Sequence, residues 1–221
     1  MPTSDRDFWI RLYAGASLKE LPWFNQSPFP PLVQDVDAGV LQPPGPVLDV
    51  GCGVGTNTHW LASRGFQATG VDLAPGAIAA AEARRRSGDR TTAFHIDDVL
   101  ASSLPAASFR SAVDIGCFQT LPPRKRTEYV VGLSRLLRPE STMLLYWVAR
   151  EEEGAWGPPH RLSVDEVVAP FEPLFRVEEV THRPRTTPLT PQVKRSGRPL
   201  ALLAGYTARL VRRTRPQPPP R

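Results

Sequence analysis

The stretch VLDVGCGVG, residues Val47–Gly55, places three glycines at every second position directly after a short apolar run. The apolar run is typical of a buried strand, and the segment that follows, TNTHWLASRG, is typical of a helix that ends at Gly65. Glycines between a strand and a helix let a ligand approach the backbone, and the helix start offers free N–H groups. We therefore expect a ligand-binding turn here.

A carboxylate at the end of the next predicted strand indicates what kind of ligand binds. That strand, FQATGVDL, contains Asp72, which lies 21 residues after Gly51. At this spacing an acid accepts hydrogen bonds from the ribose hydroxyls of an adenosine ligand. The alternative is an acid that caps the following alanine-rich helix. Asp98, at the end of a third predicted strand, TAFHIDDVL, is expected where a loop meets the adenine edge.

The glycine pattern separates two kinds of adenosine ligand. Dinucleotide-binding turns read G-x-G-x-x-G, whereas this turn reads G-x-G-x-G and follows Asp49. A carboxylate at that place disfavours a diphosphate and favours a cationic ligand. S-adenosylmethionine carries a sulfonium and an ammonium group and no phosphate. The sequence therefore predicts S-adenosylmethionine as the cofactor.

The rest of the chain alternates strands with helices, which predicts a mostly parallel sheet with helices on both faces. The last two strands have no helix between them, so we expect an antiparallel finish. Strands are expected at 46–51, 66–73, 92–100, 108–118, 141–151, 175–183 and 200–213. Helices are expected near 9–13 and 31–40, and at 56–65, 74–88, 124–138 and 163–175.

Composition and charge limit the protein class. The 221 residues fit one domain (1–221), with an N-terminal lid and substrate-side segment (1–46), a core (47–182) and a basic end (183–221). The net charge of +5 comes from that end, with ten Arg or Lys and no Asp or Glu. Prolines, not base-stacking aromatics, interleave its basic residues, so we expect a solvated loop and tail rather than a nucleic-acid surface.

Several partners are not expected. Two cysteines and four histidines do not suggest a zinc site, so no metal is predicted. No apolar run approaches the roughly 20 residues of a membrane span, and the N-terminus lacks a signal pattern. We expect a cytoplasmic protein, monomeric or homodimeric, with a small-molecule methyl acceptor.

The motifs VLDVGCGVG, GVDL, DDVL and DIGCF together resemble the class I S-adenosylmethionine-dependent methyltransferases over about residues 47–150. This resemblance implies a Rossmann-like, doubly wound α/β fold with seven strands, the last antiparallel. Trp9-x-x-x-Tyr13 followed by Pro22-Trp23 is similar to the N-terminus of thiol, thiopurine, halide and tellurite methyltransferases. DIGCFQTL resembles that group's D-x-G-x-F-H-x-L stretch, with Gln119 where histidine is usual, and GPPHRLSVDEV resembles its segment after the fifth strand.

The resemblance implies a set of cofactor contacts. Gly51 and Gly53 would pack under the methionine part, Asp49 would face the ammonium and Asp72 would hold the ribose. Asp98 is preferred over Asp97 because it precedes Val99-Leu100, as in the family pattern. The complete set is Asp49, Gly51, Cys52, Gly53, Asp72, Leu73, Asp98, Val99, Asp114 and Trp23. Asp98 as a surface acid and Asp114 as a structural acid remain alternatives.

The acceptor side is less defined. Candidate substrate contacts are Trp9, Tyr13, Trp23, Gln119 and His160, and the last two are also weak catalytic candidates. The tryptophans form either a lid over the sulfonium or plain packing. Cys117 is expected to be a buried small hydrophobe rather than a nucleophile. A lone loop histidine such as His160 is more often solvated than a substrate contact or a base.

The sequence shows no Lys–Asp or His–Glu base pair, which favours a thiol or another soft acceptor over an ordinary hydroxyl. The alternative within the class is an O- or N-methyltransferase that tailors a secondary metabolite. This chain lacks the N-P-P-aromatic motif that nucleic-acid methyltransferases often carry after the fourth strand. It also lacks the third glycine and the Tyr-x-x-x-Lys site that an NAD-dependent oxidoreductase would need. A non-catalytic binding protein is disfavoured by the intact glycine turn.

Overall fold

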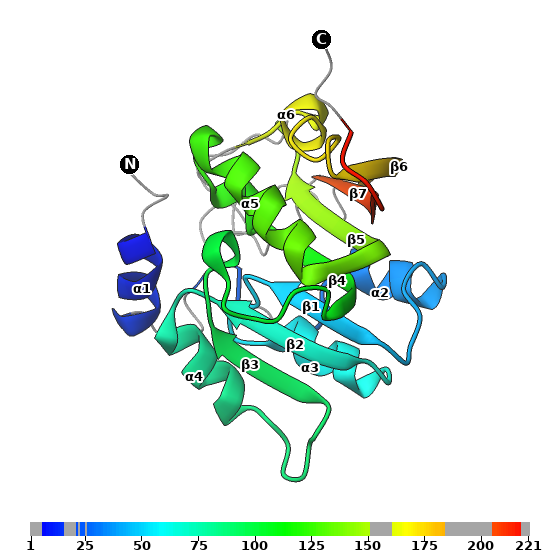
Figure 1. Cartoon of the computed structure of the whole chain (residues 1–221). Helices are drawn as coiled ribbons and strands as arrows, with labels where there is room; N and C mark the ends of the chain where they lie inside the picture. Colours follow the sequence, from blue (N-terminus) through cyan, green and yellow to red (C-terminus); the bar gives the residue numbers. More distant parts are fainter. Residues whose placement is uncertain are drawn as a thin grey trace.

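A seven-stranded sheet crosses the molecule in the computed structural model, which describes residues 6–15, 21, 23–24, 26–150, 161–183 and 205–217 (Figure 1). The strand order is β3-β2-β1-β4-β5-β7-β6. The strands are β1 (Pro46–Val50), β2 (Gln67–Asp72), β3 (Thr92–Ile96), β4 (Phe109–Ile115), β5 (Leu137–Val148), β6 (Phe175–Arg183) and β7 (Gly205–Arg212). The helices are α1 (Arg6–Gly15), α2 (Pro30–Asp37), α3 (Thr56–Ser63), α4 (Pro75–Ala83), α5 (Pro123–Leu136) and α6 (Val164–Val168), with 3-10 turns η2 (Val99–Ala101) and η3 (Phe118–Thr120).

The pairing of the strands confirms the predicted fold class. β1 pairs in parallel with both β2 and β4, β2 with β3, and β4 with β5. β7 runs antiparallel between β5 and β6. The strand order reverses between β1 and β4, and ligands of open α/β sheets bind beyond the carboxyl ends of the strands at such a switch point.

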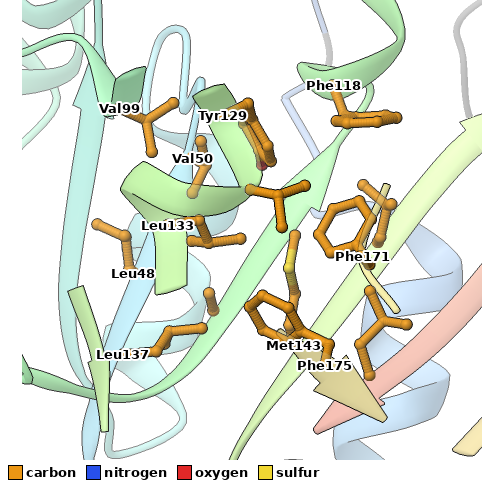
Figure 2. Packing of buried hydrophobic residues seen from close by; sticks show 14 of the residues in the cluster. Leu48, Val50, Val99, Phe118, Tyr129, Leu133, Leu137, Met143, Phe171 and Phe175 are labelled. Atoms are coloured by element: carbon orange, nitrogen blue, oxygen red, sulfur yellow. The ribbon is translucent and has the colours of Figure 1, made fainter. Parts of the chain in front are cut away.

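The two faces of the sheet bury different residues because side chains alternate along a strand. Leu48 and Val50 of β1 face a large apolar cluster that includes Leu133 of α5 and Phe171, and Figure 2 shows these side chains together. Val47 faces the opposite cluster, with residues of α2 and α3. In Figure 1, α5 crosses the front of the sheet while α2 and α3 lie behind it.

Some predicted boundaries were wrong. α6 ends at Val168 instead of continuing to Phe175, because Pro170 has no N–H with which to continue the helical hydrogen bonds. α4 ends at Ala83 rather than at Gly88, and its C-cap residue Arg84 directs its guanidinium toward the glycine turn. β5 begins at Leu137, where α5 passes straight into an extended backbone.

Candidate functional site

The glycine turn follows β1 and has a backbone that other residues rarely adopt. Gly51, Gly53 and Gly55 have φ angles of +66°, +55° and +73°. Cβ atoms on the first two would lie 2.7 Å from the Cβ of Cys117 and 2.9 Å from the hydroxyl of Tyr13. The turn therefore requires glycine for both conformation and space, and it forms a cradle in which a bound molecule can touch main-chain atoms.

Asp72 ends β2 and organises this turn. Its Oδ2 accepts a hydrogen bond from the Gly53 N–H at 2.9 Å, and its Oδ1 accepts one from the Ala74 N–H at 2.9 Å. Partial burial raises the pKa of the carboxyl group, although these backbone donors lower it. The bond to Ala74 is a local contact of the turn before α4, and that helix has no side-chain cap. The ribose role stays a prediction, placed at the expected strand end.

Asp49 lies beneath the turn. Its side chain is buried on the α3 side of the sheet, and its Oδ2 accepts a hydrogen bond of 2.6 Å from the Thr58 hydroxyl. Burial raises its pKa to about 6, and the nearby charge of Asp72 adds to this effect. A buried negative charge under a backbone cradle fits a cationic ligand better than a phosphate. Its contact with the cofactor ammonium stays a prediction.

Asp97 and Asp98 follow β3 and have different tasks. Asp97 bonds within its own loop, accepting from the Ser102 hydroxyl at 2.7 Å and from the backbone N–H of Asp98. Asp98 caps η2 through the Leu100 N–H at 3.0 Å and forms an ion pair with Arg6 of α1 at 3.9 Å. Asp98 is thus the acid of the two that points toward α1, and Val99 beside it is buried.

The N-terminal segment packs against the glycine turn. α1 contacts α4 closely, since a Cβ on Gly76 would meet the Tyr13 carbonyl oxygen at 2.6 Å (Figure 1). The Tyr13 hydroxyl accepts a hydrogen bond from Trp23 Nε1 at 3.0 Å, and burial raises the pKa of that tyrosine. The rings of Trp9 and Trp23 meet edge to face at 5.5 Å. These contacts show that the segment packs against the glycine turn and α4, and a lid over the sulfonium stays a prediction.

Asp114 is the next-to-last residue of β4 and is completely buried. Its Oδ1 accepts from the Cys117 N–H at 2.7 Å, and its Oδ2 accepts from the Phe118 N–H at 2.9 Å and the Tyr129 hydroxyl at 2.5 Å. Burial raises its pKa to about 7 against the lowering effect of these donors. The structural alternative therefore describes the contacts of Asp114 in this structure, and a direct ligand contact stays a prediction.

Gln119 also has a structural partner. Its amide is buried, and Oε1 accepts a hydrogen bond of 2.9 Å from the Val148 N–H at the end of β5. A carboxamide is not a base near neutral pH, and its oxygen is used here to join η3 to β5. A contact with the acceptor stays a prediction. His160, the other weak catalytic candidate, lies outside the described residues.

One cysteine, Cys52, lies within the turn, and the other, Cys117, packs against it. Cys117 meets Gly51, and Cys52 lies beside Gly70 and Phe94. Burial raises the pKa of both thiols well above the usual value, so neither is a thiolate at neutral pH. Leu73, between Asp72 and the start of α4, is half-buried.

Three residues that support the site were missed by sequence reasoning. Thr58 and Tyr129 donate to the buried acids, and Arg84 Nη1 donates to the Val54 carbonyl at 3.1 Å and the Thr56 hydroxyl at 2.9 Å. Only Thr58 had a local signal, since it lies in the first turn of α3, nine residues after Asp49. The other two reach the site from distant segments.

The described residues give no sign of a metal centre or a membrane span. No three His, Cys, Asp or Glu side chains in those ranges gather to hold a metal ion. None of the described helices is long and apolar enough to cross a membrane.

Comparisons with known proteins agree with this geometry. The family model described as thiopurine S-methyltransferase matches residues 4–204. A 2-heptyl-1-hydroxyquinolin-4(1H)-one methyltransferase of Mycobacteroides abscessus is 26% identical over 185 residues, which are 80% of this chain and 79% of the relative. A thiopurine S-methyltransferase of Xanthomonas campestris pv. campestris is 26% identical over 197 residues, covering 81% and 87% of the two chains.

Structural similarity supports the fold. A solved structure from work on the conversion of a disulfide bond into a thioacetal group during echinomycin biosynthesis superposes with a TM-score of 0.77. Its identity is 22%, and the match covers 94% of this chain and 91% of that one. The family match spans most of the sequence and includes the glycine turn and its acids. The chain therefore belongs to the thiopurine S-methyltransferase family and is an S-adenosylmethionine-dependent methyltransferase that acts on small molecules.

Proposed function

We propose that the protein methylates a small acceptor whose attacking atom is already soft or anionic near neutral pH, with a thiol as the first choice. The observation that carries this proposal is the state of Asp114. Its carboxylate ends the strand beside the glycine turn, yet it is fully buried and accepts three hydrogen bonds. A general base must reach the proton that it removes, and this acid does not.

The other described polar groups near the glycine turn are also not placed to act as a general base. Among the described residues around this turn, Asp49 is buried against Thr58, the amide of Gln119 bonds Val148, and the thiol of Cys117 has a raised pKa. An acceptor that loses its proton to solvent does not need a general base. A thiol does so readily because its pKa is near 8.5.

The cofactor fits the residues that are present. A Cβ on Gly51 or Gly53 would clash with Cys117 or Tyr13, so the backbone of the turn stays bare, and the acids Asp49 and Asp72 suit a ligand with positive charges. When bound, S-adenosylmethionine supplies a methyl group on a positively charged sulfur. The glycine turn and Asp72 would hold its adenosine and methionine parts, and the α1 segment with Tyr13 would exclude water. Catalysis then comes mainly from position.

A second candidate is methyl transfer to oxygen or nitrogen of a tailored metabolite. It is favoured by the Mycobacteroides relative, whose name describes a hydroxyquinolinone as its acceptor. The two candidates share a requirement for an acceptor that is acidic on its own. They differ in the atom that receives the methyl group.

A matched acceptor series tests the proposal. Turnover of S-adenosylmethionine would be followed with an aromatic thiol, an acidic phenol, an ordinary phenol and an aliphatic alcohol between pH 6 and 10. We expect the rate to rise with the ionised fraction of each acceptor, so the inflection moves with the acceptor pKa. Fast methylation of the alcohol, with an inflection near neutrality that no acceptor moves, would reveal a general base and overturn the proposal.

A further inference from the structure

Arg126 in the first turns of α5 is a buried cation to which no described residue offers a charged or hydrogen-bonding partner. Its side chain is 7% exposed, and its Nε has no hydrogen-bond partner. No hydrogen bond or ion pair joins its guanidinium to any described residue, and its one ring contact is with Phe118, 6.0 Å from Cζ to the ring centre. Burial lowers the pKa of this arginine. An unpaired buried charge is costly, and such groups normally have a partner.

The start of α5 is itself unusual in charge. The helix begins PPRKR, so Arg124, Lys125 and Arg126 are its first charged residues, and no acid lies in its first turn. The N-terminal end of a helix carries partial positive charge, so acids are favoured there and bases are disfavoured. Pro122 at the N-cap supplies no side-chain hydrogen bond. Lys125 pairs with Glu128 at 2.6 Å, so the charge that lacks a partner among the described residues is that of Arg126, and an anion bound at this helix start would compensate it.

The position of Arg126 connects it to the site. Phe118, over which its guanidinium lies, directly follows Cys117, whose Cβ would touch a side chain on Gly51. Phe118 also packs on Phe171 at 5.2 Å between their ring centres, so its ring is fixed (Figure 2). α5 begins just beyond the carboxyl end of β4, which is the edge of the sheet where ligands bind in this kind of fold.

We propose that Arg126 binds an anionic group, a carboxylate or a similar oxyanion, on the methyl acceptor. A planar guanidinium presents paired N–H donors that match the two oxygens of a carboxylate. The enzyme therefore selects acidic acceptors, and the helix start of α5 strengthens the preference. The identification of the bound molecule as the acceptor rests on the proposed function, whereas the anion site itself does not.

The first test uses the unmodified protein. Binding of the 2-, 3- and 4-isomers of methylthiobenzoate would be measured by calorimetry with saturating S-adenosylhomocysteine, against the three matching methylthiobenzamides. Turnover of the mercaptobenzoates would be compared with that of the mercaptobenzamides. We expect at least one acid to bind, and to be turned over, about tenfold better than its amide. Equal or better binding of the amide in every pair would overturn the proposal.

The second test uses variants. Arg126→Gln should reduce the acid-to-amide ratio in kcat/KM about tenfold while the amide is processed as before, and Arg126→Lys should restore part of the ratio. Arg110→Gln, an exposed residue near the opposite end of β4, is the control that should keep the ratio. If Arg126→Gln does not fold, the acid-to-amide ratios of Arg126→Lys and of the unmodified protein still test the proposal.

The outcomes separate this inference from the proposed function. Selective binding of the acids without methylation of any thiol would keep Arg126 and remove the thiol proposal. Methylation of thiols without a preference for acids would keep the thiol proposal and remove the anion site at Arg126. Weaker binding of S-adenosylhomocysteine by Arg126→Gln, with the acid preference intact, would show that the anion is the carboxylate of the cofactor and would overturn the inference.

Discussion

Asp72 and Asp114 stand at the carboxyl ends of two strands of one sheet, and both accept backbone N–H groups from a turn. Asp72 receives two backbone donors and stays partly exposed. Asp114 receives two backbone donors and the Tyr129 hydroxyl, and it is fully buried. The two acids differ because Asp114 has a third donor, which comes from α5, and is covered by that helix. Asp114 therefore joins elements inside the protein, whereas Asp72 stays accessible. Replacement of Asp72 should therefore change cofactor affinity, and replacement of Asp114 should change the stability of the fold.

Replacing Asp114 should have the largest effect on stability. Asp114→Ala leaves three buried donors without an acceptor, so the free energy of unfolding should fall by about 4 kcal/mol or more. Tyr129→Phe removes one donor and should cost about 1–2 kcal/mol. Urea unfolding at pH 6 measures both. Near-normal stability of Asp114→Ala would break the comparison.

Replacing Asp72 should act on the cofactor instead. Asp72→Ala removes the carboxylate predicted to hold the ribose, so the binding free energy of S-adenosylhomocysteine should weaken by roughly 2–5 kcal/mol. Stability should fall less than in Asp114→Ala, because the exposed turn can bond water. Calorimetric titration gives the affinity, and unchanged affinity would remove the ribose assignment.

The glycine turn can be tested with a pair of equal backbone changes. Gly51→Ala adds a Cβ at a φ of +66° within 2.7 Å of Cys117, which should cost about 2–4 kcal/mol in strain and overpacking and weaken cofactor binding. Gly88→Ala has a similar φ of +80° but open space, so about 1 kcal/mol of strain alone is expected. Thermal unfolding compares them, and equal losses would show that the contact with Cys117 is unimportant.

Stability should also depend on pH through the buried acids. The pKa values of Asp49 and Asp114 are raised to about 6 and about 7, from 3.8. The folded protein thus holds these protons more tightly than the unfolded chain, so their contribution to stability is greatest at low pH. It falls as the pH rises from about 4 to about 7 and is constant above. Asp114→Asn should flatten that slope in unfolding measured across this range, and an unchanged slope would refute the assignment.

The smallest effect is expected far from both turns. Arg176 of β6 pairs with Glu178 and Glu140 on the surface. Exposed ion pairs contribute little because solvent screens them, so Arg176→Ala should leave the free energy of unfolding nearly unchanged. Denaturant unfolding and cofactor titration should both stay close to the unmodified protein. A large loss would mean that the edge of the sheet is coupled to the site.

The fold and the glycine turn were predictable because their signals are local. Strand, turn and helix follow one another around Gly51, and Asp72 lies at a fixed spacing along the chain. The partners of Asp114 and Gln119 were not predictable, because Tyr129 and Val148 reach them only through tertiary packing. The length of α6 was misjudged because the capping signal at its start outweighed the proline that ends it.

The position of Tyr13 has a consequence for the rate of turnover. Its buried hydroxyl rests where Gly53 has no side chain, and α1 sits tightly on α4. If the cofactor binds over this turn, the spent cofactor leaves only after α1 lifts. We expect the departure of S-adenosylhomocysteine, rather than the chemical step, to limit the enzyme, so substitutions that loosen α1 should speed each cycle while weakening cofactor affinity.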